Sequence, residues 1–236
     1  MKAKIFAGLG LALCLTTLQA HAGTSLVSSG TGFFVSNRGH IITNEHVVRG
    51  CKEVKIRGAV DSTTAKVSAI DTENDLALLQ TDAVPSRIAT ISANGARLKV
   101  GEQVLVMGYP LDHGITGDYV TVESRVISLT GPLGEEKWIE FASSAEHGNS
   151  GGPLLDSGGN VIGVIVGKAT LTRMNNATLK QEAYKESDVA ISLPKLEGFL
   201  KQNRVYYRTQ SSGFSYSSQR LENLAKDYIV NIHCPN

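Results

Sequence analysis

The sequence predicts an all-β protein built in two halves. Short segments of alternating or wholly apolar residues follow one another closely between residues 28 and 80, and no long amphipathic helix separates them. Residues 81–97 contain Pro85 and an Asn94-Gly95 pair, which indicate a loop, and a second series of apolar segments begins at Gln103. Closely spaced strands without intervening helices are typical of β-barrels and sandwiches, so we expect two β-rich halves joined by this loop.

The first half begins with a predicted β-hairpin. Residues 33–35 and 40–43 are mostly apolar, and Ser36-Asn37-Arg38-Gly39 between them has the Asn and Gly that hairpin turns favour. Residues 44–48 predict a short helical turn capped by Thr43 or Asn44. The strands expected after it are half-buried or buried, and they span residues 54–57, 65–70 and 76–79.

The second half repeats this organisation and then changes character. Its predicted strands span residues 103–108, 120–129, 137–141 and 161–166. After Pro194 the apolar residues take helical spacing, first at Leu196, Phe199 and Leu200 and again from Gln219 to Ile229. We expect this C-terminal extension to be partly helical and to pack on the second half.

The N-terminus predicts export. Two lysines precede an apolar run at residues 5–15, and Ala20-His21-Ala22 provides an Ala-x-Ala cleavage site, so residues 1–22 are read as a signal peptide. The apolar run is too short for a membrane span. The expected location is periplasmic or extracellular, without a membrane anchor.

Charge and cysteine content narrow the possible partners. The 23 basic and 22 acidic residues give a formal net charge of +1, and both signs are spread evenly, which favours neither nucleic acid nor an anionic membrane as partner. Cys51 and Cys234 follow the predicted signal peptide, and an even number of cysteines in an oxidising compartment favours a disulfide. Two separate thiols are the alternative, because the sequence does not fix the distance between them.

A candidate nucleophile lies in the segment Gly148-Asn149-Ser150-Gly151-Gly152. Glycines let the backbone come close to a bound carbonyl, and Ser150 could attack that carbonyl if a base activates it. His46, at a strand-to-helix transition, is the candidate base, and Asp75, between a polar turn and a buried strand, is the candidate orienting carboxylate. The order His46, Asp75, Ser150 is one of three unrelated orders in which such triads occur.

Two other readings of these residues are less consistent with the pattern. The serine segment also fits G-x-S-x-G of α/β-hydrolases, but that motif requires a helix after the serine and a downstream Asp and His. Here Pro153 and the 161–166 strand follow instead. No group of His, Cys, Asp and Glu has the spacing of a metal site, so no metal or other cofactor is expected.

Three segments resemble the signature segments of trypsin-like serine proteases, especially the bacterial HtrA/Deg branch. They are Thr43-Asn44-Glu45-His46-Val47-Val48, Glu73-Asn74-Asp75-Leu76-Ala77-Leu78-Leu79 and Gly148-Asn149-Ser150-Gly151-Gly152-Pro153. Gly30-Thr31-Gly32-Phe33 and Val106-Met107-Gly108-Tyr109-Pro110 also resemble that branch, and the likeness extends over residues 28–195. The resemblance implies a chymotrypsin-like fold, with two perpendicular six-stranded β-barrels at residues 23–95 and 96–200 and an extension at 201–236.

The resemblance also implies a function and a site. The expected activity is that of a secreted serine endopeptidase acting on protein or peptide substrates through an acyl-enzyme intermediate. His46, Asp75 and Ser150 would form the triad, and the backbone N–H groups of Gly148 and Ser150 the oxyanion hole. A protease-fold binding or chaperone-like protein with a dormant triad is the alternative function.

Two departures from the family pattern bear on how the activity would be controlled. Asn149 occupies the position of an Asp that pairs with a new N-terminus in many trypsin-like enzymes, so activation by that ion pair is not expected. About 40 residues follow Pro194, too few for a PDZ module, so gating by PDZ is not expected either.

The specificity pocket is expected to involve two segments, represented by Ser144, Ala145, His147 and by Val164, Ile165, Val166. These residues favour a small or medium apolar side chain at the cleaved position. A preference for an acidic side chain, attracted by His147 and Lys168, stays open.

Overall fold

The computed structural model describes residues 28–93, 98–110, 118–142, 148–175, 180–211 and 213–235, with the side chains of Ser28 and of residues 170–185 left out. The predicted signal peptide, residues 1–22, lies outside the described residues. Within those ranges, no helix has the length and apolar character that crossing a membrane requires.

Strands dominate the described residues, as the sequence predicts. The strands are β1 (Ser28–Phe34), β2 (His40–Thr43), β3 (Val54–Gly58), β4 (Thr63–Asp71), β5 (Leu76–Gln80), β6 (Thr90–Ser92), β7 (Gln103–Gly108), β8 (Val120–Ser128), β9 (Trp138–Phe141), β10 (Pro153–Leu155), β11 (Val161–Asn175), β12 (Lys180–Ser192), β13 (Arg208–Gln210) and β14 (Ile229–Cys234). The helices are α1 (Glu45–Val48), α2 (Leu193–Gln202) and α3 (Ser218–Ala225).

The strands form two six-stranded barrels, which confirms the predicted fold class. The first barrel closes in the order β1-β14-β3-β4-β5-β2, around side chains such as Phe33, Ile42 and Leu79 that are completely buried. The second follows the order β10-β7-β8-β9-β12-β11 and closes through the pairing of β10 with β11. Closing a sheet on itself removes its unpaired edges, which lets strands this short form a stable structure.

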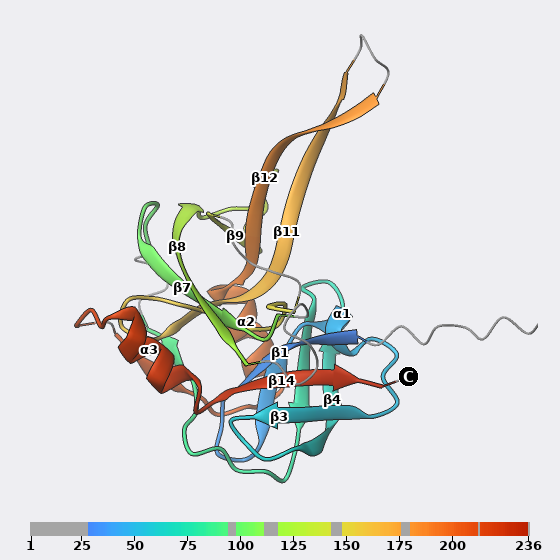
Figure 1. Ribbon diagram of the computed structural model, residues 1–236, viewed down its shortest axis with the longest axis vertical. Helices are drawn as coiled ribbons and strands as arrows, with labels where there is room; N and C mark the ends of the chain where they lie inside the picture. The colour runs from blue at the N-terminus through green and yellow to red at the C-terminus, as the bar shows by residue number, and fades with distance from the viewer. Residues whose placement is uncertain are drawn as a thin grey trace, which may run out of the picture.

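The last strand of the chain belongs to the first barrel. β14 pairs antiparallel with β1, from Ser28 opposite Cys234 to Phe33 opposite Ile229, and its other edge pairs with β3. Figure 1 shows this C-terminal strand, in red, between the blue β1 and the teal β3. The expected division of the chain needs correction here, because the barrel assigned to residues 23–95 also contains residues 229–234.

The C-terminal helices largely match the expected spacing. Leu196, Phe199 and Leu200 are buried on α2, and Leu221 is buried on α3. α3 packs against β7 of the second barrel. The second helical segment was expected to reach Ile229, and this is wrong: α3 ends at Ala225, because the apolar run that follows pairs with β1 and β3 instead.

β11 and β12 form a long antiparallel hairpin. The sequence predicts a buried strand only at residues 161–166, but β11 continues to Asn175, which lies opposite Lys180. Residues 161–165 are buried in the barrel, whereas the distal part projects away from the body of the molecule (Figure 1). The hairpin therefore contains both a core strand and an exposed arm.

A disulfide holds the C-terminal strand in the first barrel. Cys51 and Cys234 are bonded, with 5.5 Å between their Cα atoms and a sequence separation of 183. The pairing predicted from cysteine number is thus present in the structure. Since the bond closes a loop that contains most of the chain, it restricts the unfolded chain strongly.

Replacing both cysteines by Ser is expected to lower the free energy of unfolding by about 3–5 kcal/mol, because the unfolded chain regains its loop entropy. Each single replacement should cause the same loss as the double one, since all three remove the same bond. Thermal unfolding without reductant measures the loss, with reduced wild type as the control. An unchanged midpoint in the double variant would contradict the prediction.

Candidate active site

His46 and Asp75 meet at one end of the first barrel. β2 and β5 pair antiparallel with Thr43 opposite Ala77, so the helix after β2 lies beside the turn before β5. The backbone N–H of His46 donates to Asp75 Oδ1 at 3.0 Å, and His46 Nδ1 lies 2.8 Å from Asp75 Oδ2. With Nδ1–H donating to the carboxylate, Nε2 is left as the nitrogen that can accept a proton.

Asp75 is held in an unusual backbone conformation. Its φ of 54° lies in the left-handed region, which residues other than glycine rarely occupy. Its carbonyl oxygen accepts hydrogen bonds from the N–H of Glu45 at 3.2 Å and from Asn44 Nδ2 at 3.0 Å. Such strain persists only where several contacts enforce it, and it is concentrated at functional sites.

The capping expected for α1 is wrong. The side chain of the N-cap residue Asn44 makes no hydrogen bond to this helix, and Asp75 Oδ1 accepts from the N–H of His46 in its first turn. The Asn44 amide donates to Asp75 instead, and the Thr43 hydroxyl donates to the carbonyl oxygen of Thr31 at 2.7 Å. Both side chains therefore connect segments of the site rather than satisfy the helix.

The serine loop lies between the two barrels. On one side, the N–H of Gly151 donates to the carbonyl oxygen of Ile165 at 2.8 Å, which attaches the loop to β11. On the other side, the N–H of Thr31 donates to the carbonyl oxygen of Ser150 at 2.8 Å. Gly151 has a φ of 84°, and an added Cβ would lie 2.2 Å from the Thr31 oxygen and 3.0 Å from Asn44 N. The loop thus approaches the start of α1 so closely that glycine is required.

Thr31 connects this loop to Tyr109, the residue that follows β7, a role that sequence reasoning did not identify. Its hydroxyl donates to the carbonyl oxygen of Gly148 at 2.7 Å and accepts from the N–H of Tyr109 at 2.9 Å. Thr31 is completely buried. The sequence Gly30-Thr31-Gly32 could have indicated this role, because two glycines around one polar residue indicate close contact with another backbone segment.

The hydroxyl of Ser150 points to β11 in this structure. Ser150 Oγ donates to the carbonyl oxygen of Val166 at 2.7 Å. Within the described part of the chain, no hydrogen bond joins it to His46. The structure therefore pairs His46 with Asp75 and brings the serine loop close to the start of α1, but it does not show the three side chains as one hydrogen-bonded chain.

Gly148 and Ser150 have backbone N–H groups available for a ligand. Gly148 has a φ of 104°, a conformation that suits glycine. Neither N–H donates to an acceptor in the described ranges. Two such donors beside a serine hydroxyl are the elements of an oxyanion hole.

The predicted specificity residues have different positions. Ser144, Ala145 and His147 lie outside the described residues. Val164 and Ile165 are completely buried among core side chains, so they do not line an open pocket. Val166 is the member of this strand that contacts Ser150, and it does so through its backbone carbonyl.

Asn149 is completely buried beside β7. An added Cβ on Gly108 would lie 2.6 Å from Asn149 Oδ1, which shows how tightly the amide is packed. Neither its Oδ1 nor its Nδ2 has a hydrogen-bond partner within the described residues. The site therefore holds a neutral, completely buried amide at this position.

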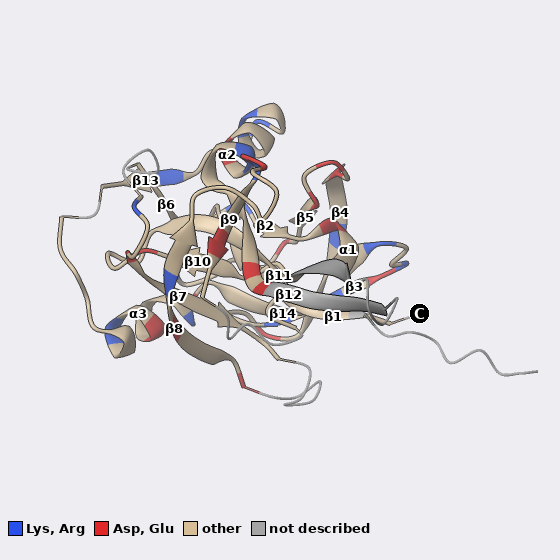
Figure 2. Ribbon diagram, turned by 90° about the horizontal axis from the view of Figure 1, so that it is seen from above, with Lys and Arg blue, Asp and Glu red and all other residues tan. Residues whose placement is uncertain are grey.

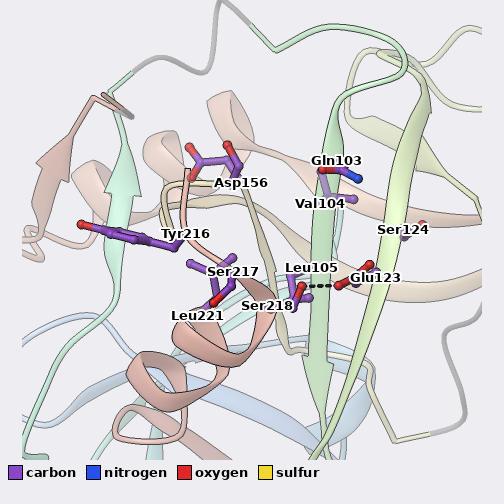
Figure 3. A pocket seen from close by; sticks show the side chains of 11 residues that line it. Gln103, Val104, Leu105, Glu123, Ser124, Asp156, Tyr216, Ser217, Ser218 and Leu221 are labelled. Atoms are coloured by element: carbon purple, nitrogen blue, oxygen red, sulfur yellow. Dashed lines mark hydrogen bonds between the residues drawn. The ribbon is translucent and has the colours of Figure 1, made fainter. Parts of the chain in front are cut away.

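A separate cavity of 390 Å³ lies between β7, β8 and the C-terminal extension (Figure 3). α3 contributes Leu221 and Ser218, whose hydroxyl donates to Glu123. The carboxylate of Asp156 also lines it, but this group accepts from the N–H groups of Gly158 and Asn160 at 2.9 Å and so stabilises a turn. None of the residues lining this cavity belongs to the catalytic candidates.

The described residues contain no candidate metal centre. No group of three His, Cys, Asp or Glu side chains in these ranges is arranged to hold an ion. His46 is bonded to a carboxylate, and the described His40 and His233 lie on β2 and β14.

The comparison with known proteins agrees with the geometry. Residues 30–164 match the model of the trypsin-like peptidase domain. The chain is 40% identical over 144 residues to Protease Do-like 1, chloroplastic, of Arabidopsis thaliana, covering 58% of this chain and 32% of that protein. It is 36% identical over 143 residues to a probable periplasmic serine endoprotease DegP-like of Hahella chejuensis, covering 58% and 29%. The match thus spans a third or less of the length of these curated relatives.

The fold is also similar to that of a solved structure. The serine endoprotease from Yersinia pestis superposes with a TM-score of 0.57 at 23% identity, over 73% of this chain and 56% of that one. At this identity the likeness concerns the fold alone. Because the family model covers more than half of the sequence, the chain belongs to the trypsin-like peptidase family.

Proposed function

We propose that this chain is an exported serine endopeptidase that cleaves peptide bonds with Ser150 as nucleophile. The observation that carries the proposal is the pair of hydrogen bonds between His46 and Asp75, at 3.0 and 2.8 Å. They orient an imidazole whose side chain is 38% exposed at the edge of the serine loop. A base held in this way can accept the proton of a serine hydroxyl.

The proposed reaction begins with a rotation of the Ser150 side chain. The hydroxyl leaves the Val166 carbonyl and donates to His46 Nε2, which takes the proton as Oγ attacks the substrate carbonyl. The N–H groups of Gly148 and Ser150 stabilise the negative oxygen that forms. His46 then protonates the leaving amine, and water hydrolyses the acyl-enzyme by the reverse proton path.

The rotation requires little free energy. A typical hydrogen bond contributes about 0.5–1.5 kcal/mol net, and Ser150 exchanges one acceptor for another. Catalytic hydrogen bonds are often loose before substrate binds. The bond to Val166 is therefore compatible with an active protease.

The alternative function is a binding or chaperone-like protein with a dormant triad. The observation that favours it is the same hydrogen bond from Ser150 to Val166, which leaves the hydroxyl away from His46. The two functions differ in one respect that is simple to measure, the reactivity of Ser150 toward an electrophile.

Export and protein substrates follow from separate observations. A signal peptide is predicted at residues 1–22, and the Cys51–Cys234 disulfide is typical of an oxidising compartment. A relative in Hahella chejuensis is described as a probable periplasmic serine endoprotease. We place this protein in the periplasm or outside the cell, with proteins or peptides as substrates.

Activity is proposed to need no cleavage that creates a new N-terminus. Asn149 is neutral and fully buried, so it has no charge with which to hold an N-terminal ammonium group. We expect mature protein that begins near Gly23 to be competent.

A fluorophosphonate probe is expected to label the mature wild type and not Ser150→Ala, because the probe traps an activated serine. Ser62→Ala, which removes an exposed hydroxyl, is the matched control and should label like wild type. Mass spectrometry of the labelled peptide identifies the site. Folded wild type that stays unlabelled would support the dormant alternative instead.

Asp75→Asn is expected to lower kcat by about 10⁴-fold while the protein stays folded, because an amide favours the wrong imidazole tautomer. Asp82→Asn, an exposed change of the same kind, should leave kcat within twofold. Cleavage of an unfolded protein substrate gives the rates, and circular dichroism checks the fold. A loss of less than tenfold in Asp75→Asn would be inconsistent with the assigned role.

Asn149→Asp is expected to lower the free energy of unfolding at pH 7 by about 3–5 kcal/mol, since it buries an uncompensated carboxylate. Burial raises the pKa of such a carboxyl, so the charged form is disfavoured in the folded state. The deficit should therefore grow as the pH rises from 4 to 7. Urea unfolding at both pH values measures it, and a variant as stable as wild type at pH 7 would show that a cationic partner is present.

A further inference from the structure

A second cavity, of 270 Å³, lies at the end of β2 opposite to α1. We call it the arginine pocket, and its main lining residues are Arg38, His40, Arg204, Tyr206, Tyr207 and Arg208. They come from the β1–β2 turn, the segment after α2, and β13. In Figure 2, α2 and β13 lie in the upper part of the view, and β2 lies nearer the middle of the molecule. The four residues of β2 separate this pocket from α1 by about 10 Å.

The charge of the pocket is uncompensated among its own residues. Its lining contains three arginines and no Asp or Glu. Within the described ranges, the ion pairs that form involve other basic side chains, namely His46, Arg49, Arg87 and Lys201. All three arginine side chains are exposed, so solvent screens their mutual repulsion, and an anion bound among them would interact favourably with each guanidinium group.

Arg204 occupies a position where glycine is normally preferred. α2 ends in a Schellman motif, with the N–H of Val205 donating to Leu200 O at 2.9 Å and that of Arg204 donating to Lys201 O at 3.0 Å. This motif places Arg204 in the left-handed region, at a φ of 55°. Glycine adopts that conformation without strain, so the helix end alone does not explain an arginine here. The reason for an arginine at this strained position must therefore lie in its side chain, which lines the pocket.

Arg38 is presented by a rigid turn. The Ser36 hydroxyl accepts from the N–H of Arg38 at 3.2 Å and lies 2.7 Å from His40 Nδ1, and Gln80 Nε2 donates to Arg38 O at 2.6 Å. Burial and the positive charge of Arg38 lower the pKa of His40, so the imidazole is neutral near pH 7 and serves as a hydrogen-bonding group. Gly39 fixes the turn further, because an added Cβ would lie 1.9 Å from Thr81 O.

The remaining side of the pocket is formed by the charged Arg208 and the aromatic Tyr206. β13 pairs parallel with β6, Arg208 opposite Thr90, which fixes the position of the third arginine. Tyr206, two residues earlier, is 82% exposed, an unusual state for so large an aromatic side chain. An exposed ring beside guanidinium groups offers a flat surface for the organic part of an anionic ligand.

We propose that the arginine pocket binds the phosphate group of a small phosphorylated molecule. Guanidinium groups bind phosphate oxygens through two parallel hydrogen bonds, and three of them can surround one phosphate or pyrophosphate. The volume of 270 Å³ is at the lower end for small-molecule sites, which favours a compact ligand. The proposal uses none of the catalytic candidates and is independent of the protease function.

Calorimetric titration of the mature protein with inorganic pyrophosphate tests the proposal. Wild type is expected to bind, and Arg38→Gln, Arg204→Gln and Arg208→Gln should each weaken binding about tenfold or more. Arg125→Gln, which removes an exposed arginine on β8, is the matched control and should bind like wild type. Absence of binding by wild type, or equal affinity in all variants, would overturn the proposal.

Arg204→Gly separates a binding role from a structural one. It should raise the melting temperature by about 2 °C, because glycine removes the strain at the helix end, and it should weaken pyrophosphate binding as Arg204→Gln does. A variant that gains stability and keeps full affinity would overturn the role of Arg204. Binding of a hexaglutamate peptide without any binding of pyrophosphate would overturn the assignment to phosphate.

Discussion

The hydrogen bonds of Thr31 are the interaction on which the arrangement of the site depends. This residue of β1 holds the carbonyl groups of Gly148 and Ser150, the N–H of Tyr109 and the hydroxyl of Thr43. Through it, a strand of the first barrel fixes a loop of the second. Since buried polar groups are costly when unpaired, these contacts resist separation of the two barrels. The serine loop therefore keeps its place relative to α1.

The position of β1 depends in turn on the end of the chain. β14 pairs with β1 along its whole length, and the disulfide fixes its last residue near α1. A segment about 200 residues away in sequence thus completes the barrel that carries His46 and Asp75. Closing so long a loop has a large entropic cost, and such non-local pairing is typical of slowly folding β-proteins. Stability and site geometry are coupled through this one strand.

The candidate site combines a histidine that Asp75 holds in place with a serine whose hydroxyl donates to the carbonyl oxygen of Val166. His46 and Asp75 are held by four hydrogen bonds that include the strained Asp75 carbonyl, whereas the Ser150 side chain has one bond, to Val166. A protease mechanism would explain why His46 is held more firmly than the Ser150 side chain. A general base must keep one tautomer and orientation, while the nucleophile has to move toward the substrate. The backbone around Ser150 is nevertheless rigid, since its glycines pack against β1 and β11.

The sequence by itself predicted strands β2 to β5, β7 to β9 and the buried part of β11, together with the order of the three catalytic candidates and the serine loop, because these depend on local patterns of apolar residues and glycine. It also predicted the Cys51–Cys234 pairing from number and compartment. Only the tertiary structure decided that β14 enters the first barrel, that Asn44 holds Asp75 instead of capping α1, and that Val164 and Ile165 are core residues. It alone brought Arg38, Arg204 and Arg208 to one pocket. Each of these features depends on pairing between distant segments, which periodicity and composition do not encode.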